Sequence, residues 1–90
     1  MSTETVHPYI MKDENVARGK PVVTGTRTRV VNIVAYYKLG YLPEELAREF
    51  PHLSLAQIYD VLSYYHENAD IIDKEIENEK EENLISTHIQ

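Results

Sequence analysis

Cysteine is absent from the sequence, which excludes disulfide bonds, thiolate nucleophiles and cysteine-ligated zinc sites. No apolar run approaches the ~20 residues that a membrane-spanning helix requires. The first residues, M-S-T-E-T-V-H-P, lack the basic and apolar regions of a signal peptide. We therefore expect a cytoplasmic protein without a structural metal site.

Positive charge is missing from a long internal stretch, because no Lys or Arg lies between Arg48 and Lys74. The net charge of −6 is unevenly distributed: residues 1–42 carry +3, residues 43–66 carry −3 and residues 67–90 carry −6. A basic front and an acidic tail indicate two partners, or one partner with two differently charged surfaces. An acidic tail that is merely solvated explains the second half of this pattern equally well.

The chain has 90 residues, of which 42% are hydrophobic and 27% charged. These fractions are ordinary for a globular domain. A chain of this size buries only roughly 60–65% of its unfolded surface, so its stability margin is small. We therefore expect one domain that gains stability by forming a homodimer.

The stretch from Pro43 to His66 predicts two helices with a tight break between them. Pro43 suits a first helical position, and Pro51 cannot continue the helix that it follows. Ser54 and Gln57 have the spacing of a capping box, which begins the second helix. Its apolar residues recur at helical spacing at Leu55, Ile58, Leu62 and Tyr65. The arrangement is typical of a helix-turn-helix unit, and an ordinary corner between two helices is the alternative.

The preceding residues predict a β-ribbon and one more helix. Residues 9–29 have the β-branched and turn residues of a short hairpin, with Gly25 in a tight turn. A helix is expected over residues 29–39, with Thr28 as its N-cap and Gly40 as a left-handed C-terminal cap.

The acidic end predicts a separate helix. Asn68 favours a break, so a separate helix is expected over roughly residues 69–83. The alternative is one unbroken helix, because Ala69, Ile72 and Ile76 continue the apolar stripe in register. Ile72 and Ile76 alone are too few to hold this helix on the body, so it needs a second chain or it frays. Residues 83–90 are expected to be disordered.

Several segments together resemble the bacterial family called domain of unknown function 433. They are H-P-Y-I at residues 7–10, G-K-P-V-V-T-G-T-R at 19–27, P-E-E-L at 43–46 and F-P-H-L-S-L-A-Q-I-Y at 50–59. The resemblance covers about residues 7–68 and implies a homeodomain-like or winged-helix-like helix-turn-helix. Some members are antitoxins of the VapB type, encoded beside a PIN-like ribonuclease toxin, whereas many others have no assigned role.

The chain departs from the family pattern in two places. Leu42 stands where the family usually has a capping Ser or Thr, and loss of such a cap costs about 1 kcal/mol. Thr28-Arg29 stands where the family often has Ile-Pro. Arg29 adds a positive charge at a position where a contact to a DNA phosphate would favour DNA binding.

DNA binding needs side chains for base edges and cations for phosphates. The candidate residues are Lys20, Arg27, Arg29, Gln57 and Ser63. Asp60 and Glu67 oppose this function, because they place negative charge on the helix that would enter the groove. The alternative is that Lys20, Arg27 and Arg29 only pair with acidic helix faces of the same chain.

Binding of a PIN-like toxin is the second expected activity, because an acidic amphipathic tail could cover a basic RNA path. Its candidate apolar anchors are Ile72, Ile76, Leu84 and Ile85. Catalysis is not expected. His66 and Asp70 are too few to hold a metal, Gly19-Lys20 lacks the pattern of a phosphate-binding loop, and nothing indicates a cofactor.

We therefore predict a mainly α fold: a three-helix helix-turn-helix with an N-terminal β-hairpin over residues 1–68, and an acidic helix and tail over residues 69–90. The predicted function is that of an antitoxin which binds a PIN-like toxin and its own promoter DNA. The alternative is a protein-interaction or oligomerisation domain without DNA affinity.

Overall fold

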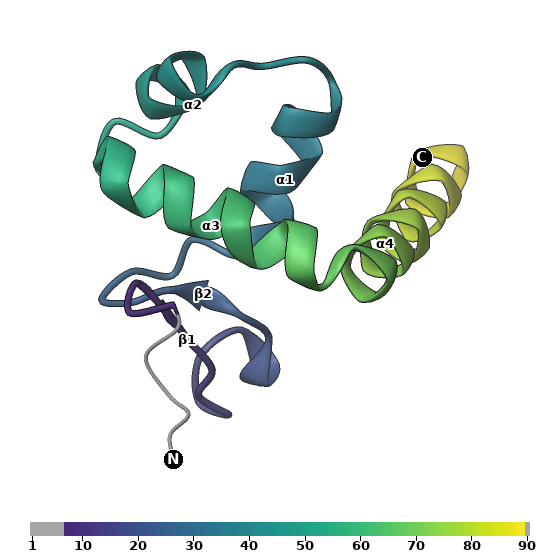
Figure 1. Ribbon diagram of the computed structural model, residues 1–90. Coiled ribbons are helices and arrows are strands. Elements are labelled where there is room, and N and C mark those ends of the chain that lie inside the picture. The colour runs from purple at the N-terminus through teal and green to yellow at the C-terminus, as the bar shows by residue number, and fades with distance from the viewer. Residues whose placement is uncertain (1–6, 90) are drawn as a thin grey trace.

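The computed structural model describes the backbone of residues 7–89 and the side chains of residues 7–79. The fold is mainly α-helical, with a two-stranded antiparallel sheet at its N-terminal end, as the sequence predicts (Figure 1). In chain order the elements are β1 (Ile10–Met11), a 3-10 turn η1 (Ala17–Gly19), β2 (Val22–Val23), α1 (Val30–Lys38), α2 (Pro43–Glu49), α3 (Leu55–Glu67) and α4 (Ala69–Ile89). Within the described residues, no helix is both long and apolar enough to span a membrane.

The ribbon is a short hairpin in which Ile10 pairs with Val23 and Met11 pairs with Val22. Both valines are fully buried, so β2 packs on the helices. Between the strands the chain passes through a left-handed turn, in which Ala17 and Arg18 have φ of 52° and 57°. Left-handed backbone costs about 1–2 kcal/mol for a residue with a side chain. Interactions elsewhere in the fold therefore offset the conformational cost of this turn.

The first helix begins at Val30, and its N-cap is Arg29 rather than the predicted Thr28. Thr28 is not available as a cap because its hydroxyl group lies 2.6 Å from Nε2 of His52. The helix starts here because the amide of Val30 donates to the carbonyl of Pro21, which ties α1 to the ribbon. Gly40, at a φ of 106°, follows the end of the helix as predicted.

The hydrophobic core lies where α1, α2 and α3 meet. The fully buried side chains of these three helices are Val30, Ile33, Val34, Leu46, Ile58 and Val61. Of the stripe predicted on α3, Leu55 is 42% exposed and lies outside the core. The buried positions of α3 are instead Ile58, Val61, Leu62 and Tyr65. Leu55 shares a helix face with Leu62, seven residues later, but it is the first residue of the helix and stays exposed.

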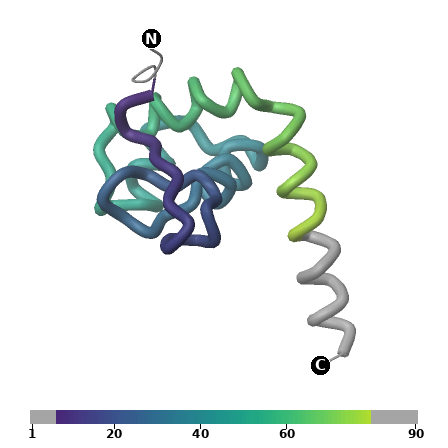
Figure 2. Tube along the Cα trace, turned by 90° about the horizontal axis from the view of Figure 1, so that it is seen from below, coloured from purple at the N-terminus to yellow at the C-terminus, as the bar shows by residue number. Residues whose placement is uncertain are grey.

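The break between α3 and α4 falls at Asn68, as predicted, where φ is −131° and ψ is 32°. The side-chain amide of Asn68 donates to the carbonyl of Tyr64, 2.9 Å away. At this point α4 turns sharply away from the axis of α3 (Figure 2). The helix runs to Ile89, so it includes most of the segment that the sequence predicts to be disordered.

α4 is held on the body by more than its isoleucines, contrary to the expectation from the sequence. Ile72 is buried in the core and Ile76 packs against it. Oδ1 of Asp73 lies 2.7 Å from Nζ of Lys38 and 2.8 Å from the hydroxyl group of Tyr65. These hydrogen bonds lower the pKa of Asp73, so its carboxylate stays charged and links α4 to α1 and α3.

Candidate nucleic-acid interface

The helix-turn-helix is formed by α2, a turn and α3, and each helix starts with a side-chain cap. The backbone amide of Ser54 donates to Oε1 of Gln57 at 2.7 Å, and the amide of Gln57 donates to Oγ of Ser54 at 3.2 Å. This is the predicted capping box. At α2, the amide of Leu42 donates to Oε1 of Glu45 at 2.7 Å, so Glu45 supplies half of the cap that Leu42 cannot provide.

The turn between α2 and α3 is held by a backbone hydrogen bond within it and by the contact of His52 with Thr28. Phe50 ends α2, and the amide of Leu53 donates to its carbonyl at 2.9 Å. Leu53 is buried, whereas His52 reaches the hydroxyl group of Thr28. The turn is therefore attached to the loop that carries Arg27, a solvent-exposed side chain.

The exposed face of α3 is the surface that a recognition helix would present to DNA, and most of it is uncharged. Its uncharged residues are Leu55, Ala56, Tyr59 and Ser63, and His66 and Glu67 are exposed at the C-terminal end of the helix. Tyr59 is 52% exposed and Leu55 is 42% exposed. Tyrosine and serine offer a stacking surface and hydroxyl groups to base edges, and an exposed apolar side chain suits the thymine methyl group.

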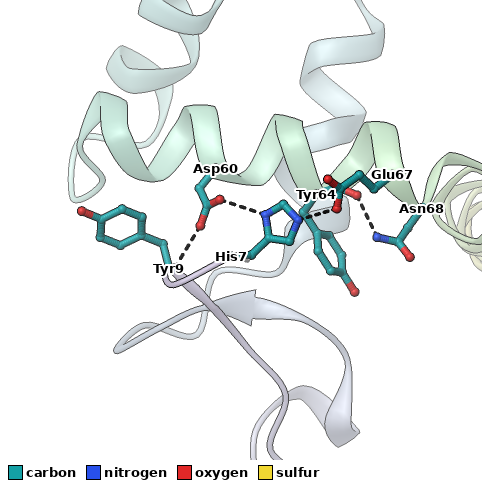
Figure 3. A network of polar contacts seen from close by, with 6 residues as sticks. All are labelled: His7, Tyr9, Asp60, Tyr64, Glu67 and Asn68. Carbon is teal, nitrogen blue, oxygen red and sulfur yellow. Dashed lines mark hydrogen bonds and ion pairs between the residues drawn. The ribbon is translucent and has the colours of Figure 1, made fainter. Parts of the chain in front are cut away.

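The two acids of α3 that oppose DNA binding are both bound by one histidine (Figure 3). Nδ1 of His7 lies 2.9 Å from Oδ1 of Asp60, and Nε2 lies 2.6 Å from Oε1 of Glu67. The amide of Tyr9 donates to the other oxygen of Asp60 at 3.0 Å. The His7 ring also makes an edge contact with the ring of Tyr64. We call these five residues the His7 clasp.

Charge makes the clasp favour a protonated histidine. A carboxylate only accepts hydrogen bonds, so His7 donates from both nitrogens only as the imidazolium ion. Partial burial lowers the pKa of His7, but the hydrogen bonds to Glu67 and Asp60 outweigh it and raise the pKa above its ordinary value near 6.5. When His7 is protonated, the imidazolium cancels one of the two negative charges, which weakens the repulsion of a phosphate backbone by α3.

The comparisons with known proteins agree on one family. The family model described as "Protein of unknown function (DUF433)" matches residues 10–65. The chain is a member of the DUF433 family. The crystal structure of a DUF433 member protein from Anabaena variabilis is 31% identical to it, with a TM-score of 0.69; the match covers 76% of this chain and 67% of that one. The search of curated proteins finds no match to this chain.

The DUF433 match includes the ribbon and the helix-turn-helix, and it ends at Tyr65. Asp60 therefore lies inside the matched segment, whereas His7 and Glu67 lie outside it, as does the whole of α4. The clasp was not predicted from the sequence. Asp60 and Glu67 are seven residues apart, which places them on one helix face, but nothing local indicates that His7 reaches them.

The candidate cations of this DUF433 protein do not form one group. Nζ of Lys20 lies 2.9 Å from Oε2 of Glu75, and the guanidinium group of Arg29 contacts Glu75 and Glu79. Arg27 is exposed and forms no ion pair with any residue between 7 and 79. Two of the three cations thus have partners in α4, which is the alternative raised by the sequence.

The other candidate residues have mixed positions. Ser63 is exposed, whereas Gln57 is half-buried and its side-chain oxygen is occupied by the cap. Among the apolar anchors predicted for a partner, Ile72 is only 2% exposed and Ile76 packs against the core of the same chain. The side chains of Leu84 and Ile85 lie outside the described residues. In the part of the chain that the structure describes, no three His, Asp or Glu side chains are placed to hold a metal ion.

Proposed function

We propose that this DUF433 protein is a DNA-binding module, without catalytic activity, that acts as the antitoxin of a PIN-like ribonuclease. In this proposal α3 enters the major groove, two copies bind as a homodimer, and α4 contacts the toxin. The helix-turn-helix is the element by which many repressors read operators.

The observation that carries the proposal is the set of side chains that α3 exposes, together with the pairing of its two acids. The capped helix presents four exposed uncharged residues, Leu55, Ala56, Tyr59 and Ser63, and the clasp holds its two acids against the imidazole ring of His7. Its N-terminal end adjoins the loop of Arg27 through the contact between Thr28 and His52. A cation beside the N-terminus of a recognition helix is suited to a phosphate contact.

The antitoxin role is supported by the family resemblance and by the length of α4. Its 21 residues extend about 30 Å at 1.5 Å per residue. The described contacts of α4 with the body lie between Ala69 and Glu79. The later residues Leu84 and Ile85 are the anchors that we assign to the toxin, because Ile72 is already part of the core.

A second function is favoured by a specific observation. Glu75 and Glu79 pair with Lys20 and Arg29, which leaves fewer cations for phosphates than the sequence indicates. A protein-interaction domain without DNA affinity fits this pairing.

A titration of labelled upstream promoter DNA at two salt concentrations separates the two functions. The DNA-binding proposal predicts tight, salt-dependent binding.

Arg27→Ala should reduce the slope of log affinity against log salt by about 0.9, the value for one phosphate contact. Tyr59→Ala should weaken binding roughly tenfold through loss of a base contact. Lys74→Ala, which removes an exposed cation from α4, is the matched control and should change neither. Absence of DNA binding at low salt would leave the protein-interaction domain as the function.

The toxin contact is tested in the full chain, because truncation at Asn68 would remove Ile72 from the core. The double substitution Leu84→Ser and Ile85→Ser should weaken binding to the product of the adjacent gene and relieve inhibition of its ribonuclease activity. Leu39→Ser, at a side chain that is 77% exposed on the body, is the control and should bind normally. Full inhibition of the ribonuclease by the double variant would show that α4 does not contact the toxin through Leu84 and Ile85.

A further inference from the structure

A pocket between the ribbon and α4 collects positive charge on a chain of net charge −6. It has a volume of about 480 Å³, and its charged lining residues are Arg18, Lys20, Arg29, Glu75 and Glu79. Three cations thus face two carboxylates. The excess of positive charge means that α4 does not fully neutralise the pocket.

The contacts inside the pocket leave hydrogen-bond donors unused. Nε of Arg29 is buried and donates to no described residue. Arg18 lines the pocket, is exposed and forms no ion pair with any carboxylate of residues 7–79. A guanidinium group offers five donors in a planar fork that suits the oxygens of a carboxylate or a phosphate.

The backbone that places Arg18 is strained. Ala17 and Arg18 both have left-handed φ, a conformation that residues with side chains rarely adopt. Such strain tends to be kept where a function requires it. In this protein the left-handed backbone at Ala17 and Arg18 places Arg18 and Lys20 on the same side of the pocket, opposite α4.

We propose that Arg18, Lys20 and Arg29 form a binding site for phosphate oxygens of the DNA backbone, and that Glu75 and Glu79 of α4 occupy this site as internal competitors. This inference rests on the proposed DNA binding and names a second contact region for it. A carboxylate and a phosphate use the same donors, so the site holds one or the other. Lys20, which pairs with Glu75, is 51% exposed, and Glu79, which pairs with Arg29, is 36% exposed. Solvent and a phosphate can therefore reach one partner of each ion pair while the helix stays in place.

The decisive variant is the double substitution Glu75→Gln and Glu79→Gln, which keeps the shape of both side chains and removes their charge. We expect promoter DNA to bind it roughly tenfold more tightly at low salt, because two cations are released. The salt slope should steepen by about 1.8, or ~0.9 for each new phosphate contact.

A matched control is Asp70→Asn with Glu77→Gln, which removes the same charge from exposed positions of α4. It should leave the slope unchanged. Addition of Arg18→Gln to the Glu75/Glu79 variant should reduce the slope again by about 0.9. If the double variant fails to fold by circular dichroism, Glu79→Gln alone should give a smaller change of the same sign.

Three results would overturn the inference. Equal salt slopes for the Glu75/Glu79 variant and its control, with DNA binding still weakened in Tyr59→Ala, would exclude this pocket as a DNA contact but keep the proposed function. A variant that gains affinity for poly-L-glutamate and not for DNA would show that the pocket takes carboxylates. Failure of every variant to bind DNA would overturn both proposals.

Discussion

At the scale of single residues, the pairing of His7 with Asp60 and Glu67 is the feature that the local sequence does not indicate. Its two carboxylate partners are 53 and 60 residues away in the chain. They meet it only because the ribbon packs on α3, so the pairing depends on the tertiary fold. The caps of α3, by contrast, are predictable, because Ser54 and Gln57 are three residues apart and the capping box is a local interaction.

The clasp predicts a pH dependence of stability. Because folding raises the pKa of His7, its contribution is fully present below the unfolded value near 6.5 and is lost as the pH rises through the folded pKa. Urea unfolding of the wild type should therefore show a lower midpoint at pH 8 than at pH 6. His7→Gln removes this component, so the difference between wild type and variant should shrink over the same range. A difference that is constant or grows with pH would contradict the imidazolium assignment.

The cap of α3 predicts a local loss of stability. Ser54→Ala removes the acceptor for the amide of Gln57 and should lower the free energy of unfolding by about 1 kcal/mol. Ser63→Ala, on the exposed face of the same helix, should change it by less than about 0.5 kcal/mol. Chemical denaturation of both variants measures the difference, and equal values would mean that the cap is not formed.

At the scale of elements, the break points were predictable and the attachments were not. Pro51 and Asn68 interrupt helices for local reasons, and the structure confirms both breaks. From the sequence, pairing of Lys20 and Arg29 with acidic helix faces was one alternative, but Asp73, Glu75 and Glu79 were not identified as the partners. In the structure they face Lys38, Lys20 and Arg29, because the turn at Asn68 directs α4 along the body. The direction of a helix after a break depends on packing, which periodicity does not specify.

Two neighbouring isoleucines of α4 test how this helix is attached. Ile72 is 2% exposed and Ile71 is 69% exposed. Ile72→Ala should lower the free energy of unfolding by about 2–5 kcal/mol, because it leaves a cavity in the core. Ile71→Ala should have an effect below about 0.5 kcal/mol. Similar losses for the two variants in thermal unfolding would show that α4 does not pack as described.

At the scale of the whole molecule, the charge asymmetry has a different meaning from the one that the sequence indicates. The basic front and the acidic tail meet each other, since Lys20, Arg29 and Lys38 all pair with α4. This arrangement leaves the uncharged exposed residues of α3 and the exposed Arg27 as the primary contact region in the proposed DNA binding. The fold class followed from turn and cap signals, whereas the site required knowledge of which distant charges come together.

The most direct test of the DNA-binding account is an NMR titration of the ¹⁵N-labelled protein with unlabelled promoter DNA. The account predicts that the largest amide shifts cluster at residues 55–63 of α3 and at Arg27, with small shifts in α2 and in the core of α1. Shifts confined to α4, or no shifts at low salt, would contradict the assignment of α3 as the recognition helix.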